Sequence, residues 1–108
     1  MWEVLYMALV EISILPIGTS SASISEYIAD CIATLKKHKN VNYKLTSMGT
    51  IIEGELDDIL KVIRAMHEVP FNSGALRVVT AIRIDDRRDK KLTMDSKVES
   101  VMAKLKEG

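Results

Sequence analysis

Hydrophobic and polar residues alternate along two stretches of the chain, 7–15 and 77–85. A period of two residues is typical of a strand with one buried face. Two shorter strands are predicted at about 41–47 and 50–56, where β-branched residues flank a tight connection through Gly49. The chain therefore contains four predicted strands.

Three other stretches carry apolar residues at helical spacing. The first helix is predicted to begin at Ser23, which forms a capping-box pattern with Glu26 three residues later. The second begins near Asp57, and Pro70 should end or kink it because proline lacks an amide hydrogen. The third is predicted over about 94–106, with an apolar stripe on one side.

The order of these elements is β-α-β-β-α-β, followed by a C-terminal helix. Short connections and right-handed crossovers favour an α+β, ferredoxin-like sandwich, in which an antiparallel four-stranded sheet carries helices on one face. We expect residues 1–108 to form a single domain. The helix-free face would carry Leu9, Glu11, Ser13, Ile51, Glu53, Glu55, Val79, Ala81, Arg83 and Asp85. Such a mixed face predicts cover by another subunit.

Composition excludes several classes of protein. Fifteen basic and fifteen acidic residues give a formal net charge of zero, which provides no electrostatic basis for binding nucleic acid. The apolar N-terminal stretch is too short to cross a bilayer, so we expect no membrane association. Cys31 is the only cysteine, and a cytoplasmic location is the expectation for such a chain.

Two groups of polar residues are candidates for chemistry. Glu53 and Glu55 lie two apart in a predicted strand, where carboxylates are depleted; they would either contact a ligand or pair with a basic group such as Arg83. The hydroxyl-rich turn 19–23 precedes a helix and would either hold an anion or polar ring or simply cap the helix. The residues leave these alternatives open.

Several activities known for this architecture require residues that this sequence does not contain. The predicted central strands carry no aromatic rings for stacking RNA bases, and one cysteine cannot hold an iron–sulfur cluster. The turn after the first strand contains no arginine for binding phosphate. His38 and His67 lack metal-ligand spacing, and no nucleophile–base pair is visible. We therefore expect a binding module without metal or cofactor rather than an enzyme.

Several motifs in order resemble the small thiamin-binding family of ferredoxin-like proteins, and the resemblance covers almost the whole chain. They are Pro16-Ile17-Gly18-Thr19, then Ser21 and Ser23, Met48-Gly49-Thr50, Ile52-Glu53-Gly54-Glu55, and Arg77-Val78-Val79-Thr80. Ser47 departs from the family pattern, where many members carry proline, and Pro70 interrupts a helix that usually continues.

This resemblance implies a function. Family members assemble into dimers and tetramers through their sheets and bind thiamin, or its hydroxymethylpyrimidine half, near a subunit interface. The corresponding ligand-binding residues here are Thr19, Ser21, Ser23, Met48, Gly49, Thr50, Glu53, Glu55 and Arg83. A carboxylate such as Glu53 suits the exocyclic amine of an aminopyrimidine. The alternative is a structural or regulatory homo-oligomer with an unidentified small-molecule ligand.

Overall fold

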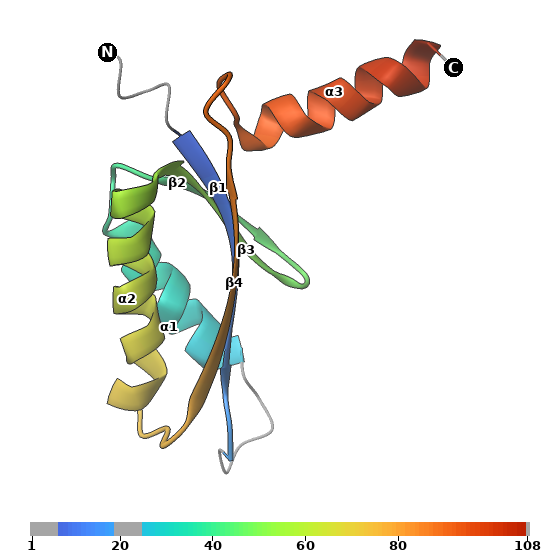
Figure 1. The fold of residues 1–108 in the computed structure, drawn as a ribbon. Helices are drawn as coiled ribbons and strands as arrows, with labels where there is room; N and C mark the ends of the chain where they lie inside the picture. Colours follow the sequence, from blue (N-terminus) through green and yellow to red (C-terminus); the bar gives the residue numbers. More distant parts are fainter. Residues whose placement is uncertain (1–6, 19–24, 108) are drawn as a thin grey trace.

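The computed structural model describes residues 7–18 and 25–107 (Figure 1). The helices are α1 (Ser25–Lys36), α2 (Leu56–Asn72) and α3 (Met94–Glu107), and the strands are β1 (Met7–Pro16), β2 (Asn42–Thr46), β3 (Gly49–Glu55) and β4 (Val78–Asp86). The capping box predicted at Ser23 lies partly outside the described residues. No helix within the described ranges is both long and apolar enough to cross a membrane.

The four strands form one antiparallel sheet in the order β2-β3-β1-β4. Helices α1 and α2 cover one face, and the other face carries neither of them (Figure 1). The predicted α+β arrangement and order of elements are confirmed. Strand limits differ from the prediction by at most one residue, as is usual at element ends.

Strand register determines which side chains share a face. Leu9 lies opposite Glu53 and Asp85, and Glu11 lies opposite Ile51 and Arg83. Opposite residues in an antiparallel ladder point to the same side, so these residues share the helix-free face, as predicted. We call this side the open face.

The core lies between the sheet and the two helices. Its central residues are Ala8, Val10 and Ile12 of β1, Ile52 of β3, Cys31 and Leu35 of α1, and Ile59, Val62, Ile63 and Met66 of α2. Pro70 is also buried. It lies in the last turn of α2, which ends two residues later at Asn72.

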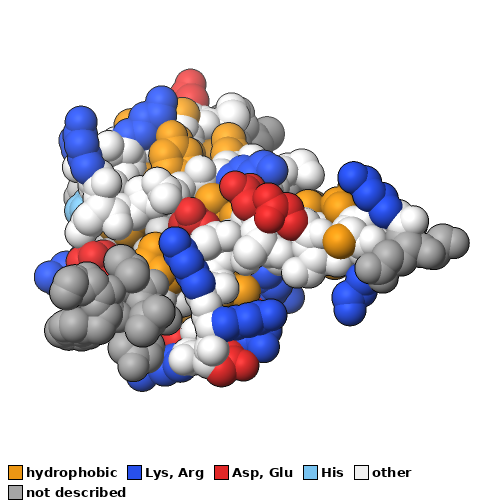
Figure 2. All heavy atoms as spheres, turned by 90° about the horizontal axis from the view of Figure 1, so that it is seen from above, with side chains coloured by type: hydrophobic (Ala, Val, Ile, Leu, Met, Phe, Trp, Pro, Cys, Tyr) orange, Lys and Arg blue, Asp and Glu red, His pale blue; other side chains and the backbone are white. Residues whose placement is uncertain are grey.

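Helix α3 stands apart from this core. Its first turn is fixed by a reciprocal pair of hydrogen bonds: the amide of Ser96 donates to Thr93 Oγ1, and the amide of Thr93 donates to Ser96 Oγ, both at 3.0 Å. Beyond that turn the helix projects away on the open side of the sheet (Figures 1 and 2). Its apolar stripe is 50–67% exposed at Val98, Val101, Met102 and Leu105.

Candidate functional site

Two hollows flank the sheet. The first, which we call the hairpin cavity, has a volume of about 280 Å³ and lies where the β2–β3 hairpin turns back. The last pair between β1 and β3 is Ile12 with Thr50, so β1 continues past the hairpin beside β4 alone. The cavity walls are Ile12, Ser13, Ile14, Leu15, Ile28, Cys31, Ile32, Leu45, Thr46, Ser47, Met48, Gly49, Thr50 and Met66.

Thr50 supplies the most informative polar group in the hairpin cavity. It is only 6% exposed, and its hydroxyl makes no hydrogen bond to another described residue. Buried hydroxyls nearly always have a partner, because leaving one unpaired costs about 1–3 kcal/mol. A hydroxyl of this kind in a cavity wall is suited to bind a ligand.

The hairpin turn holds Thr50 in place. Thr46 Oγ1 donates to the carbonyl of Gly49 at 2.8 Å and accepts from the amide of Met48 at 3.3 Å. A Cβ atom on Gly49 would lie 2.9 Å from the carbonyl oxygen of Ile12, so only glycine allows this approach. Met48 is 84% exposed at the tip of the turn. Its flexible thioether can pack over a ring that enters the cavity.

Cys31 forms part of the cavity wall contributed by α1. Its thiol lies 3.6 Å from the carbonyl oxygen of Met66. Burial, reinforced by the charge of Asp30, raises the pKa of the Cys31 thiol to about 11. The thiol is therefore protonated and unreactive near neutral pH. Cys31 thus contributes apolar surface rather than chemistry.

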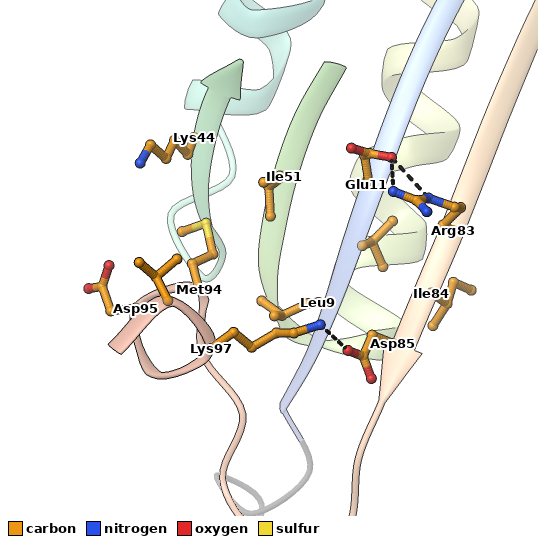
Figure 3. A pocket seen from close by; sticks show the side chains of 12 residues that line it. Leu9, Glu11, Lys44, Ile51, Arg83, Ile84, Asp85, Met94, Asp95 and Lys97 are labelled. Atoms are coloured by element: carbon orange, nitrogen blue, oxygen red, sulfur yellow. Dashed lines mark hydrogen bonds and ion pairs between the residues drawn. The ribbon is translucent and has the colours of Figure 1, made fainter. Parts of the chain in front are cut away.

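The second hollow lies on the opposite side of the sheet. We call it the open-face groove; it has a volume of about 590 Å³ and lies between the strands and the start of α3 (Figure 3). Its lining is Leu9, Val10, Glu11, Lys44, Ile51, Arg83, Ile84, Asp85, Met94, Asp95, Lys97 and Val98. Both hollows are close to or within the range of about 300–1,000 Å³ that small-molecule sites occupy.

Charged side chains in the open-face groove largely neutralise each other. Arg83 donates from Nε and Nη2 to the same oxygen of Glu11, at 3.0 and 2.7 Å. Lys97 donates to Asp85 at 2.7 Å and ties α3 to β4 (Figure 3). Both pairs are solvent-exposed and so contribute little stability. The interpretation that Glu53 pairs with Arg83 is not realised, because Arg83 pairs with Glu11.

Glu53 has a different set of partners. One carboxylate oxygen accepts from the side-chain amide of Asn42 at 3.0 Å, and the other accepts from the backbone amide of Met94 at 2.8 Å. An anion at a helix N-terminus is favourable because the first amides lack partners within the helix. Glu53 therefore anchors the start of α3 to the sheet.

The structure thus separates the residues that the sequence grouped together. Met48, Gly49 and Thr50 line the hairpin cavity, whereas Arg83 lines the open-face groove. Glu53 and Glu55 are among the lining residues of neither hollow. The remaining candidates, Thr19, Ser21 and Ser23, lie outside the described residues.

Sequence reasoning missed Thr46, whose hydroxyl shapes the turn, and the contribution of α1 to the cavity wall. The position of Thr46 next to the Met48-Gly49-Thr50 motif was the available signal. Within the described ranges no cluster of three His, Cys, Asp or Glu side chains is placed to hold a metal ion.

A four-stranded ferredoxin-like sandwich with a cavity at its hairpin defines a fold class rather than a particular chemistry. Comparison with known families is more specific. The family described as Thiamine-binding protein matches residues 10–102, most of the chain. The chain belongs to this family.

Individual relatives are similar to the chain over most of its length. The chain is 52% identical to UPF0045 protein YqgV of Bacillus subtilis, over 88% of this chain and 94% of that protein. It is 47% identical to a UPF0045 protein of Staphylococcus xylosus, over 94% of this chain and 98% of that protein. The crystal structure of hypothetical protein MJ1052 of Methanocaldococcus jannaschii is 36% identical and superposes with a TM-score of 0.81, over 88% and 95% of the two chains.

Proposed function

We propose that this chain binds thiamin or its hydroxymethylpyrimidine moiety without transforming it, as a cytoplasmic carrier, buffer or sensor. Membership of the thiamine-binding family supports the ligand class. The observation that carries the proposal is the buried hydroxyl of Thr50 in the wall of the hairpin cavity, which makes no hydrogen bond to another described residue.

The chemistry of the cavity suits the pyrimidine half of thiamin. An aminopyrimidine ring has apolar faces and an edge with both donors and acceptors. Ile12, Ile28 and Ile32 offer apolar walls to the faces, and the Thr50 hydroxyl offers either a donor or an acceptor to the edge. None of the described residues that line the cavity is charged. The neutral pyrimidine therefore enters the cavity, and the thiazolium cation stays toward its mouth, where solvent stabilises the charge.

Self-association is part of the proposal. The open face leaves Leu15 and Val79 44% and 46% exposed, and the apolar stripe of α3 is exposed as well. A second copy that packs its sheet against this face would cover both surfaces in a dimer or tetramer, and isologous contacts of this kind are the commonest in soluble oligomers.

Isothermal titration with thiamin, and separately with hydroxymethylpyrimidine, tests the ligand assignment. We expect saturable binding of both by the native protein. Thr50→Val preserves the shape of the side chain and removes the hydroxyl, so affinity for hydroxymethylpyrimidine should fall about tenfold, the equivalent of one hydrogen bond of about 1.4 kcal/mol. Folding stability should stay the same or rise, because the buried hydroxyl that is removed makes no hydrogen bond within the described part of the chain.

Thr80→Val is the matched control. Thr80 lies on the helix-covered face of β4, hydrogen-bonded to His67 at 2.7 Å and absent from the cavity wall, so its replacement should leave affinity unchanged. No heat from either compound with the native protein would reject the ligand assignment. It would favour the alternative, a structural or regulatory oligomer with another ligand. Native affinity in Thr50→Val would place the ligand outside the hairpin cavity.

A further inference from the structure

Strand β1 has a short free backbone edge beside the hairpin cavity. Its pairing with β3 ends at Ile12 and Thr50, whereas its pairing with β4 continues to Pro16. Residues 13–16 therefore border the cavity with no described strand on that side, and Ile14 is among the cavity walls. We call the space beside these residues the strand gap.

Two contacts show which backbone groups point into the strand gap. In an antiparallel ladder the N–H and C=O of one residue point to the same neighbouring strand, and successive residues alternate. The amide of Ile17 donates to the carbonyl of Arg77 at 2.8 Å, just before β4, so odd-numbered residues of β1 face β4. The carbonyl oxygen of Ile12 lies close to Gly49, so even-numbered residues face β3. Ile14 therefore directs both its amide and its carbonyl into the strand gap.

The hairpin turn keeps β3 from reaching Ile14. The register of β1 and β3, extended by two residues, would place Met48 opposite Ile14. The amide of Met48 instead donates to Thr46 Oγ1 within the turn. Among the described residues, none bonds to the amide or carbonyl of Ile14 in place of Met48. Ile14 therefore offers one donor and one acceptor, side by side, to the hairpin cavity.

The strand gap is too short for an added peptide strand. Pro16 is the next residue of β1 that faces this side, and proline has no amide hydrogen. A peptide would find one complete pair of backbone groups instead of the row that strand addition uses. A flat heterocycle with one donor beside one acceptor needs only that single pair. The strand gap therefore favours a small molecule.

We infer that the backbone of Ile14 recognises the amine-bearing edge of the ligand, an inference that rests on the proposed function. Hydroxymethylpyrimidine carries an exocyclic amine next to a ring nitrogen. The Ile14 amide donates to the ring nitrogen and the Ile14 carbonyl accepts from the amine, as they would with a residue of β3. The ring then lies in the strand gap, with Ile28 and Ile32 of α1 against one face.

This contact selects a class of ligand. The Thr50 hydroxyl can donate or accept, so it tolerates many polar groups. The Ile14 pair has fixed polarity, because an amide only donates and a carbonyl only accepts. Rings with an amine beside a ring nitrogen therefore bind, whereas the corresponding lactam presents N–H to N–H and C=O to C=O and is rejected. Ile14 thus determines specificity through its backbone.

Isothermal titration with two analogues of hydroxymethylpyrimidine tests this polarity. The first analogue carries a methyl group in place of the amine and should bind about tenfold more weakly, because one hydrogen bond is lost. The second is the lactam, with oxygen in place of the amine. It should bind at least about 100-fold more weakly, because both backbone groups stay unpaired. Equal affinity for the amine and the lactam would overturn the inference.

Nuclear magnetic resonance locates the contact in the native protein. With ¹⁵N-labelled hydroxymethylpyrimidine bound, we expect a scalar coupling across the hydrogen bond between the Ile14 amide nitrogen and a ring nitrogen. Ile12 is the matched control: its amide faces the same side but is paired with Thr50, so it should show no such coupling. A saturated protein without the coupling at Ile14 would reject the contact and leave the ligand assignment intact.

Ile14→Pro removes the amide hydrogen without removing a ladder bond, and Pro16 shows that this side of β1 accepts proline. Affinity for hydroxymethylpyrimidine should fall about tenfold. Ile14→Val is the matched control, since it keeps the amide and nearly the volume of proline; it should bind almost as the native protein does. The coupling measurement decides the question if Ile14→Pro does not fold.

The two proposals can be told apart by comparing variants. Weaker binding in Thr50→Val together with native binding in Ile14→Pro would keep the ligand in the hairpin cavity and reject only the role of Ile14. Weaker binding in both variants is the expected result. No binding by the native protein would reject both proposals.

Discussion

The two faces of the sheet are built from the same four strands, yet they differ in composition and in burial. The helix-covered face is mainly apolar and carries the buried core, and its Thr50 hydroxyl lines the hairpin cavity, whereas its Thr80 hydroxyl is hydrogen-bonded to His67. The open face mixes Leu9 and Ile51 with the Glu11–Arg83 and Asp85–Lys97 pairs, which solvent reaches.

Alternation along a strand permits this division, because neighbouring residues point to opposite sides. Thr50 and Glu53 are three residues apart on β3, about 10 Å along the strand, and they lie on opposite faces. Thr50 lines the hairpin cavity, and Glu53 holds the start of α3. Proximity in sequence therefore does not define a site in a strand.

Adjacent residues of β3 give the largest expected contrast. Ile52 is fully buried and Ile51 is half-buried on the open face. We expect Ile52→Ala to lower the free energy of unfolding by about 2–5 kcal/mol, because it leaves a cavity in the core. Ile51→Ala should cost about 1 kcal/mol, since water and side chains can fill the space. Urea denaturation of both variants at low protein concentration measures the difference.

A similar loss from both variants would contradict this contrast. It would show that the open face is as tightly packed as the core, which a stable partner on that face would explain. Repeating the denaturation over a range of protein concentrations separates the cases, because the stability of an oligomer depends on concentration.

The fold could be predicted because it rests on local periodicity. Alternation in β1 and β4 determined both their limits and the division between faces, and helical spacing determined α2 and α3. These signals are contained in short windows of sequence. The residues of the open face were predicted from the same alternation, and the register confirms them.

The site was harder to predict because its contacts are long-range. Glu53 meets the amide of Met94, 41 residues away, and no spacing rule links them. The burial of Thr50 depends on where the hairpin ends relative to β1. The apolar stripe of α3 predicted a helix that packs one face against another surface. Periodicity does not say whether that surface belongs to the same chain.

Cys31 tests how well the helix-covered face excludes water. Its thiol has a pKa of about 11 in the folded chain against an ordinary value of 9.0. Between pH 9 and 11 the unfolded chain loses this proton while the folded chain keeps it. Stability should therefore fall as pH rises, by up to about 1.4 kcal/mol per pH unit, and be unaffected by this thiol below pH 9.

Cys31→Ala is the reference, because other groups also titrate in this range. The variant should be less stable at neutral pH and should lose stability less steeply above pH 9. Urea denaturation at several pH values gives both slopes. Equal slopes would mean that the thiol ionises as readily in the folded chain as in the unfolded one, and hence that water reaches this part of the helix-covered face.

Glu53→Gln gives the smallest expected effect and tests the open face directly. A glutamine oxygen can still accept from the amide of Met94, and Asn42 can rotate its own amide to match the new side chain. Only the contribution of the charge is lost, about 1 kcal/mol or less. Amide exchange at Met94 should accelerate, while affinity for hydroxymethylpyrimidine in the hairpin cavity should stay at its native value.

Glu55→Gln is the control for this variant, since Glu55 lies on the same face of β3 and its carboxylate makes no hydrogen bond or ion pair with another described residue. It should change neither the amide exchange at Met94 nor the affinity for hydroxymethylpyrimidine. The opposite result for Glu53→Gln, weaker ligand binding with unaltered exchange at Met94, would make Glu53 the acceptor for the exocyclic amine. The ligand would then reach the open face, and the proposal that it binds only on the helix-covered side of the sheet would be wrong.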